Sequence, residues 1–241
     1  CGMTQGLKAT AIGYYAGGVN QGSYAIALGY YAAQTSQGAS AIALGLSAGN
    51  NTQAGSAIAI GPYAGNLTQA LYAVAIGNEA GKTTQGTYTV AIGNFAGKTS
   101  QATQGIAIGR EAGQTSQGNN SVAIGAYTGH TGQAQTAVAI GYTAGMTSQA
   151  AYAVAVGRSA GSTSQGYSST AVGDGAGQYS QGFKAVAIGH RAGWGSTTAG
   201  DGQADNAVAI GREAGMTAQT GIAIGYGAGM LTQAGIALGV F

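Results

Sequence analysis

The stretch from Tyr72 to Gln101, YAVAIGNEAGKTTQGTYTVAIGNFAGKTSQ, contains one motif twice. Each copy reads VAIGN, then an acidic or aromatic residue, then AGKT, a hydroxyl residue and Gln. The glycine that follows the apolar triplet, here termed the marker glycine, recurs every 16 residues from Gly13 to Gly189. Three further markers follow at intervals of 22, 14 and 14 residues: Gly211, Gly225 and Gly239. So regular a period predicts a repeat array in which each unit packs on its two neighbours.

The predicted array is a single domain over residues 1–241. It has 16-residue coils to about residue 189 and 14-residue coils over residues 211–241. The 22-residue interval contains the stretch GSTTAGDGQADN, Gly195 to Asn206, and is six residues longer than the regular period of 16. Because the coils on both sides must still stack, we expect this insertion to leave the array as an outward loop.

The composition excludes the commonest classes of protein. The chain has 47 glycines, one proline and 6% charged residues, yet 45% of its residues are hydrophobic. Globular domains carry about a quarter charged residues, and disordered chains pair low hydrophobicity with high charge. The net charge of +2, with the basic residues scattered, argues against a nucleic-acid partner. No apolar run approaches the ~18–20 residues that cross a bilayer, so direct membrane insertion is not expected.

The only cysteine is Cys1, so no internal disulfide is expected. A cysteine at the first position is either the lipid-bearing residue of a processed bacterial lipoprotein or a fragment boundary, and both interpretations stay open.

The triplet before each marker glycine alternates as a strand requires, because successive strand residues point to opposite faces. Its outer residues are branched in nearly every unit, and its middle residue is alanine in all fifteen. The branched residues are predicted to point into the core: Val74, Ile76, Val90, Ile92, Val138 and Ile140. Alanine is a poor strand former, so its uniform use indicates that another chain approaches the second face closely. The alanines assigned to this contact are Ala75, Ala91, Ala107, Ala123 and Ala139.

The remainder of the unit predicts a corner turn, a second strand and a return turn. The Ala-Gly pair after the marker, such as Ala80-Gly81, supplies a small side chain and a residue free to adopt positive φ. Neither strand segment carries a charge, and frequent glycine excludes a helix. A glutamine eight residues after the marker is predicted to stack as a ladder: Gln37, Gln53, Gln69, Gln85, Gln101, Gln117, Gln133, Gln149, Gln165 and Gln181. The sequence therefore predicts an all-β solenoid with one 14–16-residue coil per repeat.

The phrase S-V-A-I-G is intact from Ser121 to Gly125 and has alanine in first place in most other units. It resembles the head repeat of the YadA-type trimeric autotransporter adhesins and similar repeats in some bacteriophage tail fibres. In that family each repeat is one turn of a left-handed β-roll, and three chains pack about a common axis. The resemblance implies a parallel homotrimer on a bacterial cell surface or a virion, with a host-surface protein or glycan as receptor. The family period is usually 14, whereas this chain uses 16 for most of its length.

We expect a non-enzymatic structural or adhesive segment that needs no cofactor and no metal. His130 and His190 lie on corners about four coils apart, and no repeat places a nucleophile beside a base. The glycines form no strand-GxGxxG-helix unit, and the spacing of Asp201 and Asp205 matches no calcium loop. The alternative function is an ice-binding solenoid, since rows of Thr, Ser and Gln on a charge-free face suit the ordering of surface water.

Two groups of residues are candidates for ligand binding. Corner tyrosines have faces that suit stacking on sugars, and they equally suit packing against the next coil or chain: Tyr14, Tyr15, Tyr30 and Tyr31. The second group surrounds the insertion, where an exposed tryptophan flanked by charge is expected: His190, Arg191, Trp194, Asp201 and Asp205. Loops on rigid scaffolds often carry function, but a tolerated decoration that marks the change of coil length is the competing interpretation.

Overall fold

The structure is a computed structural model that describes residues 4–198, 201–231 and 234–239. Cys1 lies outside the described residues. The chain divides into two compact units, Cys1–Asn120 and Ser121–Phe241. Each unit is a parallel β-solenoid, which confirms the predicted fold class. That residues 1–241 form one uninterrupted array stays a prediction.

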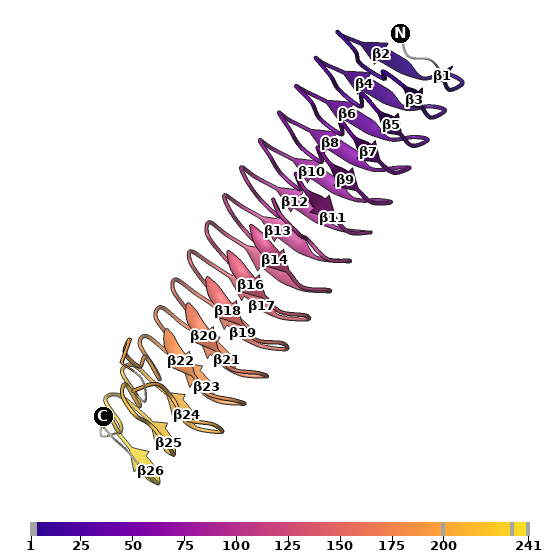
Figure 1. Cartoon of the computed structure of the whole chain (residues 1–241). Helices are drawn as coiled ribbons and strands as arrows, with labels where there is room; N and C mark the ends of the chain where they lie inside the picture. Colours follow the sequence, from indigo (N-terminus) through magenta and orange to yellow (C-terminus); the bar gives the residue numbers. More distant parts are fainter. Residues whose placement is uncertain (1–3, 199–200, 232–233, 240–241) are drawn as a thin grey trace. The chain divides into compact units, whose positions relative to one another are not determined.

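In the first unit the triplets before the marker glycines form a parallel sheet, here termed the Val/Ile sheet. Its strands are β2 (Thr10–Ile12), β4 (Ile26–Leu28), β6 (Ile42–Leu44), β8 (Ile58–Ile60), β10 (Val74–Ile76), β12 (Val90–Ile92) and β13 (Ile106–Ile108). They pair in chain order (Figure 1). The register has no slip, so that Val74 lies opposite Val90 and Ala75 opposite Ala91.

The glutamine segments of the first unit form a second parallel sheet, here termed the Gln sheet. Its strands are β1 (Thr4–Gln5), β3 (Asn20–Gln21), β5 (Ser36–Gln37), β7 (Thr52–Gln53), β9 (Thr68–Gln69) and β11 (Thr84–Gln85). Single bridges join Gln85 to Gln101 and Gln101 to Gln117, which lies in β14 (Thr115–Gln117). Each coil thus contains one short strand of each sheet, joined by a corner turn and a return turn.

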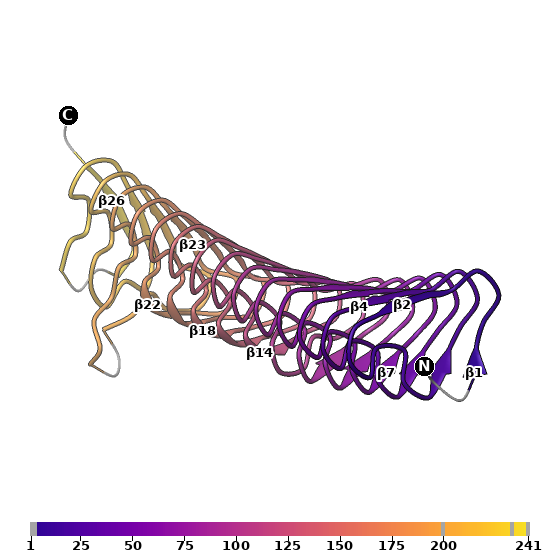
Figure 2. The same ribbon diagram turned by 90° about the horizontal axis from the view of Figure 1, so that it is seen from above.

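The second unit repeats this plan. Its Val/Ile sheet contains β15 (Val122–Ile124), β17 (Val138–Ile140), β19 (Val154–Val156), β21 (Thr170–Val172), β23 (Val186–Ile188), β24 (Val208–Ile210), β25 (Ile222–Ile224) and β26 (Ile236–Leu238). Its Gln sheet contains β16 (Thr131–Gln133), β18 (Thr147–Gln149), β20 (Thr163–Gln165) and β22 (Tyr179–Gln181). In the turned view each coil is a loop of chain that runs along one sheet and back along the other (Figure 2).

The prediction of which side chains fill the core is wrong. Ala75 and Ala91 are fully buried, whereas Val74 and Ile76 on either side of Ala75 are only half-buried. The reversal holds in both units, because none of the branched residues of either Val/Ile sheet is buried among the described coils. The core of the second unit is an unbroken cluster of alanines from Ala139 to Ala228, drawn from the strands and from the corner turns. The alternation predicts two faces correctly but not which face is inside.

Besides the glutamines, the interior holds only small side chains, mostly alanine, because the glutamine side chains cross it. Gln53 is buried, and its Nε2 lies 2.7 Å from the carbonyl oxygen of Ile42 on the opposite strand. The same Nε2 lies 3.0 Å from Oε1 of Gln69 in the next coil. Such contacts join Gln21 to Gln101 in the first unit and Gln133 to Gln219 in the second, which confirms the predicted ladder. The ladder lies inside the coil, not on its surface.

Two glycines of each coil are required by this packing. The marker Gly77 has φ 128°, and a Cβ at that position would lie 2.6 Å from the carbonyl oxygen of Gly93. Gly81 in the corner turn has φ 53°, and its Cβ would lie 2.7 Å from Oε1 of Gln85. The first glycine lets successive coils approach one another, and the second leaves room for the ladder amide.

The insertion leaves the array without breaking the ladder. Oε1 of Gln203 accepts from Nε2 of Gln181 at 3.2 Å, and Nε2 of Gln203 donates to Oε1 of Gln219 at 3.3 Å. Gln203 therefore occupies the ladder position of the regular glutamine. The first residue of the insertion is still paired, since the amide of Gly195 donates to the carbonyl of Met216 at 2.7 Å. The extra residues therefore lie between Gly195 and Gln203, and residues 199–200 lie outside the described part.

Candidate functional site

The Val/Ile sheet of each unit presents an apolar face to the exterior. In the residue row next to the marker glycines, Ile108, Ile124 and Ile140 keep 36–38% of their surface exposed. No charged residue occurs in any strand of these sheets. Single exposed apolar residues are ordinary, but large contiguous apolar faces mark interaction surfaces. This face is therefore a candidate interaction surface in each unit.

The alanines that the sequence assigned to an inter-chain contact do not reach this face. The side chains of Ala75, Ala91, Ala107, Ala123 and Ala139 are fully buried within a single chain. A second chain cannot touch them while the coil is closed, so the alanine rows are core residues and that assignment is wrong. The physical reason is that the corner turns curl the sheet toward its alanine side, where small side chains let the two sheets approach.

The corner tyrosines of the first unit form one exposed cluster, here termed the tyrosine cluster: Tyr14, Tyr15, Tyr30 and Tyr31. Tyr14 stacks on Tyr30 with ring centroids 5.3 Å apart, and Tyr15 stacks on Tyr31 at 5.5 Å. Within each coil the two rings are nearly perpendicular, at 4.5 Å and 4.3 Å. Tyr14, Tyr15 and Tyr30 remain 59%, 52% and 51% exposed. The structure thus brings together all four tyrosines that the sequence proposed for ligand binding.

The backbone that carries these rings is fixed by the coil stacking. The backbone amide of Tyr31 donates to the carbonyl oxygen of Tyr14 at 2.9 Å. The backbone amide of Ser47 donates to the carbonyl oxygen of Tyr30, also at 2.9 Å. Tyr15 and Tyr31 have φ 53° and 54°, a conformation that non-glycine residues seldom adopt. A side-chain hydrogen bond from Tyr30, with smaller effects of desolvation and of Tyr15, raises the pKa of Tyr31. The phenol of Tyr31 therefore stays neutral at physiological pH.

The corner turns farther along the first unit carry charges that pair across coils. Nζ of Lys82 and Nζ of Lys98 lie 3.1 Å and 3.0 Å from the same carboxylate oxygen of Glu79. Burial works to raise the pKa of Glu79, but the hydrogen bonds from Lys98 and Lys82 outweigh it and hold that pKa below its ordinary value. In the second unit Arg158 pairs with Asp174 in the next coil at 2.8 Å, which raises the pKa of Arg158. These pairs stabilise the stacking of corners.

The residues proposed around the insertion fall into separate places. Trp194 is half-buried, so the expected exposed tryptophan is a wrong prediction. Its Nε1 donates to Oε1 of Gln178 at 2.6 Å, and its ring packs edge-on against Tyr179 at 5.7 Å. The guanidinium carbon of Arg191 lies 5.4 Å from the centroid of the same ring. Arg191 and Trp194 therefore form a cation–aromatic pair whose indole N–H is already used.

The two aspartates have structural partners. Oδ2 of Asp201 accepts from the hydroxyl of Ser196 at 2.7 Å, within the insertion. Oδ1 of Asp205 accepts from the backbone amide of Phe183 at 2.8 Å, which holds the return turn of the neighbouring coil. His190 occupies the corner turn and is half-buried, and its Nδ1 has no hydrogen-bond partner among the described residues. The five residues are thus divided between a corner turn, the insertion and a return turn.

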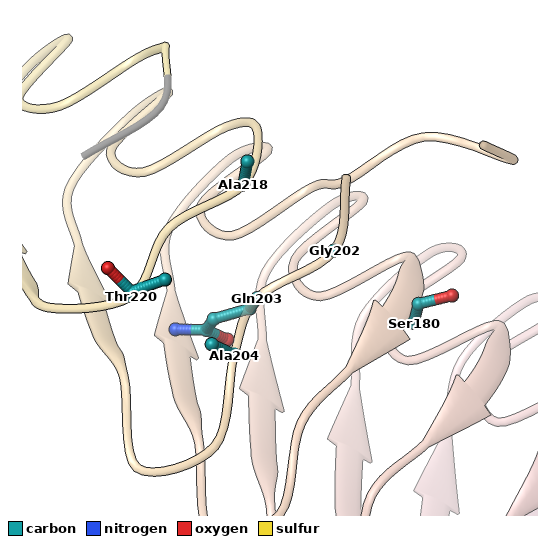
Figure 3. A pocket seen from close by; sticks show the side chains of 6 residues that line it. All are labelled: Ser180, Gly202, Gln203, Ala204, Ala218 and Thr220. Atoms are coloured by element: carbon teal, nitrogen blue, oxygen red, sulfur yellow. The ribbon is translucent and has the colours of Figure 1, made fainter. Parts of the chain in front are cut away.

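A hollow of about 240 Å³ lies where the insertion rejoins the array (Figure 3). Figure 3 shows Ser180 on one side, Ala218 and Thr220 on the other, and Gln203 between them. Gln203 belongs to the ladder, so its amide is committed to the core. Only two hydroxyl side chains line the hollow, and sites for small molecules usually hold several convergent polar groups.

The described residues contain no group of three or more His, Cys, Asp or Glu side chains that would suit a metal ion. His130 contacts Thr131, with Nδ1 and Oγ1 2.9 Å apart, and packs near the ring of Tyr127. Within the described part of the chain, no apolar helix of membrane-spanning length occurs.

The hydroxyl rows that motivated the ice-binding alternative are only partly on the surface. Thr52, Thr68 and Thr84 are exposed on the Gln sheet. The glutamines beside them are 0–4% exposed from Gln21 to Gln219, so they present no amide to the solvent. The exposed row therefore consists of Thr and Ser, and Asn20 interrupts it in the first unit.

Comparison of the chain with protein-family models, with curated proteins and with solved structures gives no match to any of them. The site rests on the geometry alone. Three ladder residues escaped the sequence-based prediction: Gln21, Gln203 and Gln219. The sequence signal for Gln203 is its distance from the next Val/Ile strand. It lies four residues before Ala207, just as Gln181 lies four residues before Ala185. Counting back from the following strand would have found it.

Proposed function

We propose that the chain is a non-enzymatic structural segment of an adhesive fibre, which self-associates through the Val/Ile face and displays its turns to a receptor. The observation that carries the proposal is the charge-free outer face of the Val/Ile sheets, on which half-exposed Val, Ile and Leu recur from coil to coil. Burial of apolar surface contributes about 25 cal/mol per Å², so a repeated face of this kind favours association.

A second copy of the same chain is the occupant that fits this face best. Its branched residues recur with the same coil spacing, about 4.8 Å in a parallel sheet. When two copies are aligned coil by coil, the side-chain rows of their faces therefore interdigitate along their whole length. An unrelated partner would need to match the same coil spacing. The number of chains, three in parallel, comes from the resemblance of the S-V-A-I-G phrase to the YadA-type head repeat. The same resemblance supports a location on a bacterial surface or a virion.

The arrangement of the remaining groups supports display rather than catalysis. Most charged side chains of the described residues lie at the turns, and several of them pair with one another or stack on aromatic rings. The turns border the Val/Ile face without belonging to it, so an oligomer that covers the face leaves them accessible. A rigid scaffold that presents side chains at its edges suits the binding of an extended receptor.

The test is the mass of the native chain in solution, measured by light scattering with and without interface charges. Ile76→Lys with Ile92→Lys places two cations on the face while leaving the alanine core intact. We expect a native trimer and a monomeric double variant, because each unpaired charge opposes burial in an apolar interface. Thr84→Lys, an exposed position on the Gln sheet of the same coil, is the matched control and should keep the native mass.

Two outcomes contradict the proposal. A monomeric native chain would overturn self-association, and thermal hysteresis measured on that monomer would favour the ice-binding alternative. An unaltered oligomer in the double variant would show that the Val/Ile face is not the contact.

A further inference from the structure

We propose that the tyrosine cluster binds a neutral glycan built of hexopyranose units. This inference deepens the proposed function, on which it rests, by assigning a chemical class to the receptor displayed at the corner turns. The surface comprises the tyrosine cluster with Leu46 and Pro62, the residues at the equivalent corner position of the next two coils.

The rings expose part of their faces. Parallel aromatic rings in full face-to-face contact are separated by about 3.5 Å. The centroid distances of 5.3 Å and 5.5 Å are larger, so the stacked rings do not cover one another completely. Tyr14, Tyr15 and Tyr30 each keep more than half of their residue surface exposed. A pyranose ring has an apolar face of C–H groups that packs on such a surface, while its hydroxyl groups project at the edges.

The cluster combines this apolar surface with polar groups at its rim. Four phenolic hydroxyls both donate and accept hydrogen bonds, and tyrosine combines a large apolar body with one polar tip. A hollow of about 330 Å³ adjoins the cluster and is lined by Gly13, Tyr14, Tyr15 and Gly18. Its volume lies at the low end of small-molecule sites. The hollow suits one sugar unit, and the aromatic surface beside it suits the units that follow.

The electrostatics select a neutral ligand. Tyr14, Tyr15, Tyr30, Tyr31, Leu46 and Pro62 provide no charge, and the first charged corner residue of this unit is Glu79. Nζ of Lys82 lies 5.5 Å from the ring centroid of Tyr63, which is outside the proposed surface. An anionic glycan would find no basic partner within the cluster. A quaternary ammonium would need rings that enclose it, whereas these rings lie side by side on an open turn.

The surface remains available when the Val/Ile face is covered. The corner residues follow the marker glycine, so they lie beyond the end of the strands that form the face. Backbone hydrogen bonds from coil to coil hold them in a row, as between Tyr63 and Leu46 at 2.8 Å. Glycan binding and self-association therefore use different residues and can fail independently.

The experiment is a titration of the full chain with three neutral hexasaccharides: cellohexaose, maltohexaose and chitohexaose. Saturation-transfer NMR reports which sugar protons contact the protein, and calorimetry gives the affinity. The test variant replaces Tyr14 and Tyr30 by Asn and Tyr15 and Tyr31 by Ser. The array itself carries these residues at the same positions, as Asn78, Asn94 and Ser47. We expect at least one hexasaccharide to bind and the variant to lose at least about ten-fold in affinity.

The matched control removes an aromatic pair of the same kind from the opposite edge. Tyr72 and Tyr88 stack at 5.1 Å and are 51% and 57% exposed, but among the described residues neither has a perpendicular partner like those of the tyrosine cluster. Their replacement by Ser, which occupies the equivalent positions 40 and 56, should leave glycan affinity unchanged. Circular dichroism verifies that both variants keep the fold.

Three results would overturn the inference. The first is a native chain that binds none of the hexasaccharides, and the second is an equal loss of affinity in the control. The third is binding of decaproline through the cluster without any glycan, which would assign the surface to an extended peptide instead. The mass of each protein is measured in parallel, so that a failure of self-association is distinguished from a failure of glycan binding.

Discussion

Nε2 of Gln69 lies 2.7 Å from the carbonyl oxygen of Ile58 on the opposite sheet and 3.1 Å from Oε1 of Gln85 in the next coil. One fully buried amide thus ties the two sheets together and also ties successive coils. A buried polar side chain is tolerated only when its hydrogen bonds are made. The ladder therefore fixes both the width of the coil and the register of the stack.

Gln69→Glu should destabilise the first unit strongly. The carboxylate has the shape of the amide but cannot donate to Ile58 or to Gln85, and burial penalises its charge, so we expect a loss of more than about 2 kcal/mol at pH 7. Burial raises the folded-state pKa of the new carboxyl above the unfolded value. The protonated form is therefore favoured in the fold, and stability should fall as pH rises through that folded pKa. Urea unfolding at pH 4 and pH 7 measures the difference.

The control for this substitution is Gln34→Glu. Gln34 is half-buried at the edge of the coil, and its Oε1 accepts from Asn50, a role that a carboxylate retains. We expect little change in unfolding. A variant at position 69 that unfolds like the native chain at both pH values would contradict the role assigned to the ladder.

Ala75→Leu and Ile76→Leu compare the two sides of one strand. The side chain of Ala75 is inside the coil and fully buried, so three added carbons should overpack the interior and cost about 1–3 kcal/mol. The side chain of Ile76 points outward, and leucine has nearly the same volume as isoleucine, so the second change should be nearly neutral for folding. Thermal unfolding monitored by circular dichroism gives both values. The reverse order of stability would restore the core that the sequence predicted.

Glu79→Gln should lower stability only above acidic pH. The folded-state pKa of Glu79 is held down by Lys98 and Lys82, so its contribution exists above the unfolded pKa and disappears as pH falls through the folded value. The ion pairs lie at a partly exposed corner, and we expect less than about 1 kcal/mol at pH 7. Melting temperatures of both proteins from pH 2 to pH 8 should converge at the acidic end. A difference that persists at pH 2 would indicate a packing effect instead.

Trp194→Ala should destabilise the second unit by about 1–3 kcal/mol. The change removes the hydrogen bond to Gln178 and the contacts with Tyr179 and Arg191, so the tryptophan is part of the packing around the insertion. Tyr226→Ala is the control, because Tyr226 also pairs with an arginine, Arg212 at 5.5 Å, but is 58% exposed. Differential scanning calorimetry compares them. Equal melting temperatures would support the view of Trp194 as a free recognition residue.

The repeat by itself determined most of the architecture. A 16-residue period with alternating side chains, an Ala-Gly corner and a spaced glutamine leaves a solenoid of short parallel strands as the one arrangement that satisfies every coil. The glutamine ladder was predictable because identical positions of stacked coils must lie above one another. The tyrosine cluster was predictable for the same reason, since Tyr14 and Tyr30 are one period apart.

Only the tertiary structure decided which face of the Val/Ile sheet is inside. Alternation places Ala75 and Ile76 on opposite faces of the sheet. It does not tell which face is inside, because a strand can curl toward either side. The inner face is determined in part by the corner turn, where Gly81 adopts a positive φ and turns the chain toward the alanine side. It is also determined by Gln85, whose long side chain spans the interior to reach the carbonyl oxygen of Val74. A core filled with Val and Ile would hold the sheets too far apart for that amide to reach the opposite carbonyl. The large apolar residues are therefore left outside, where they are available to another chain.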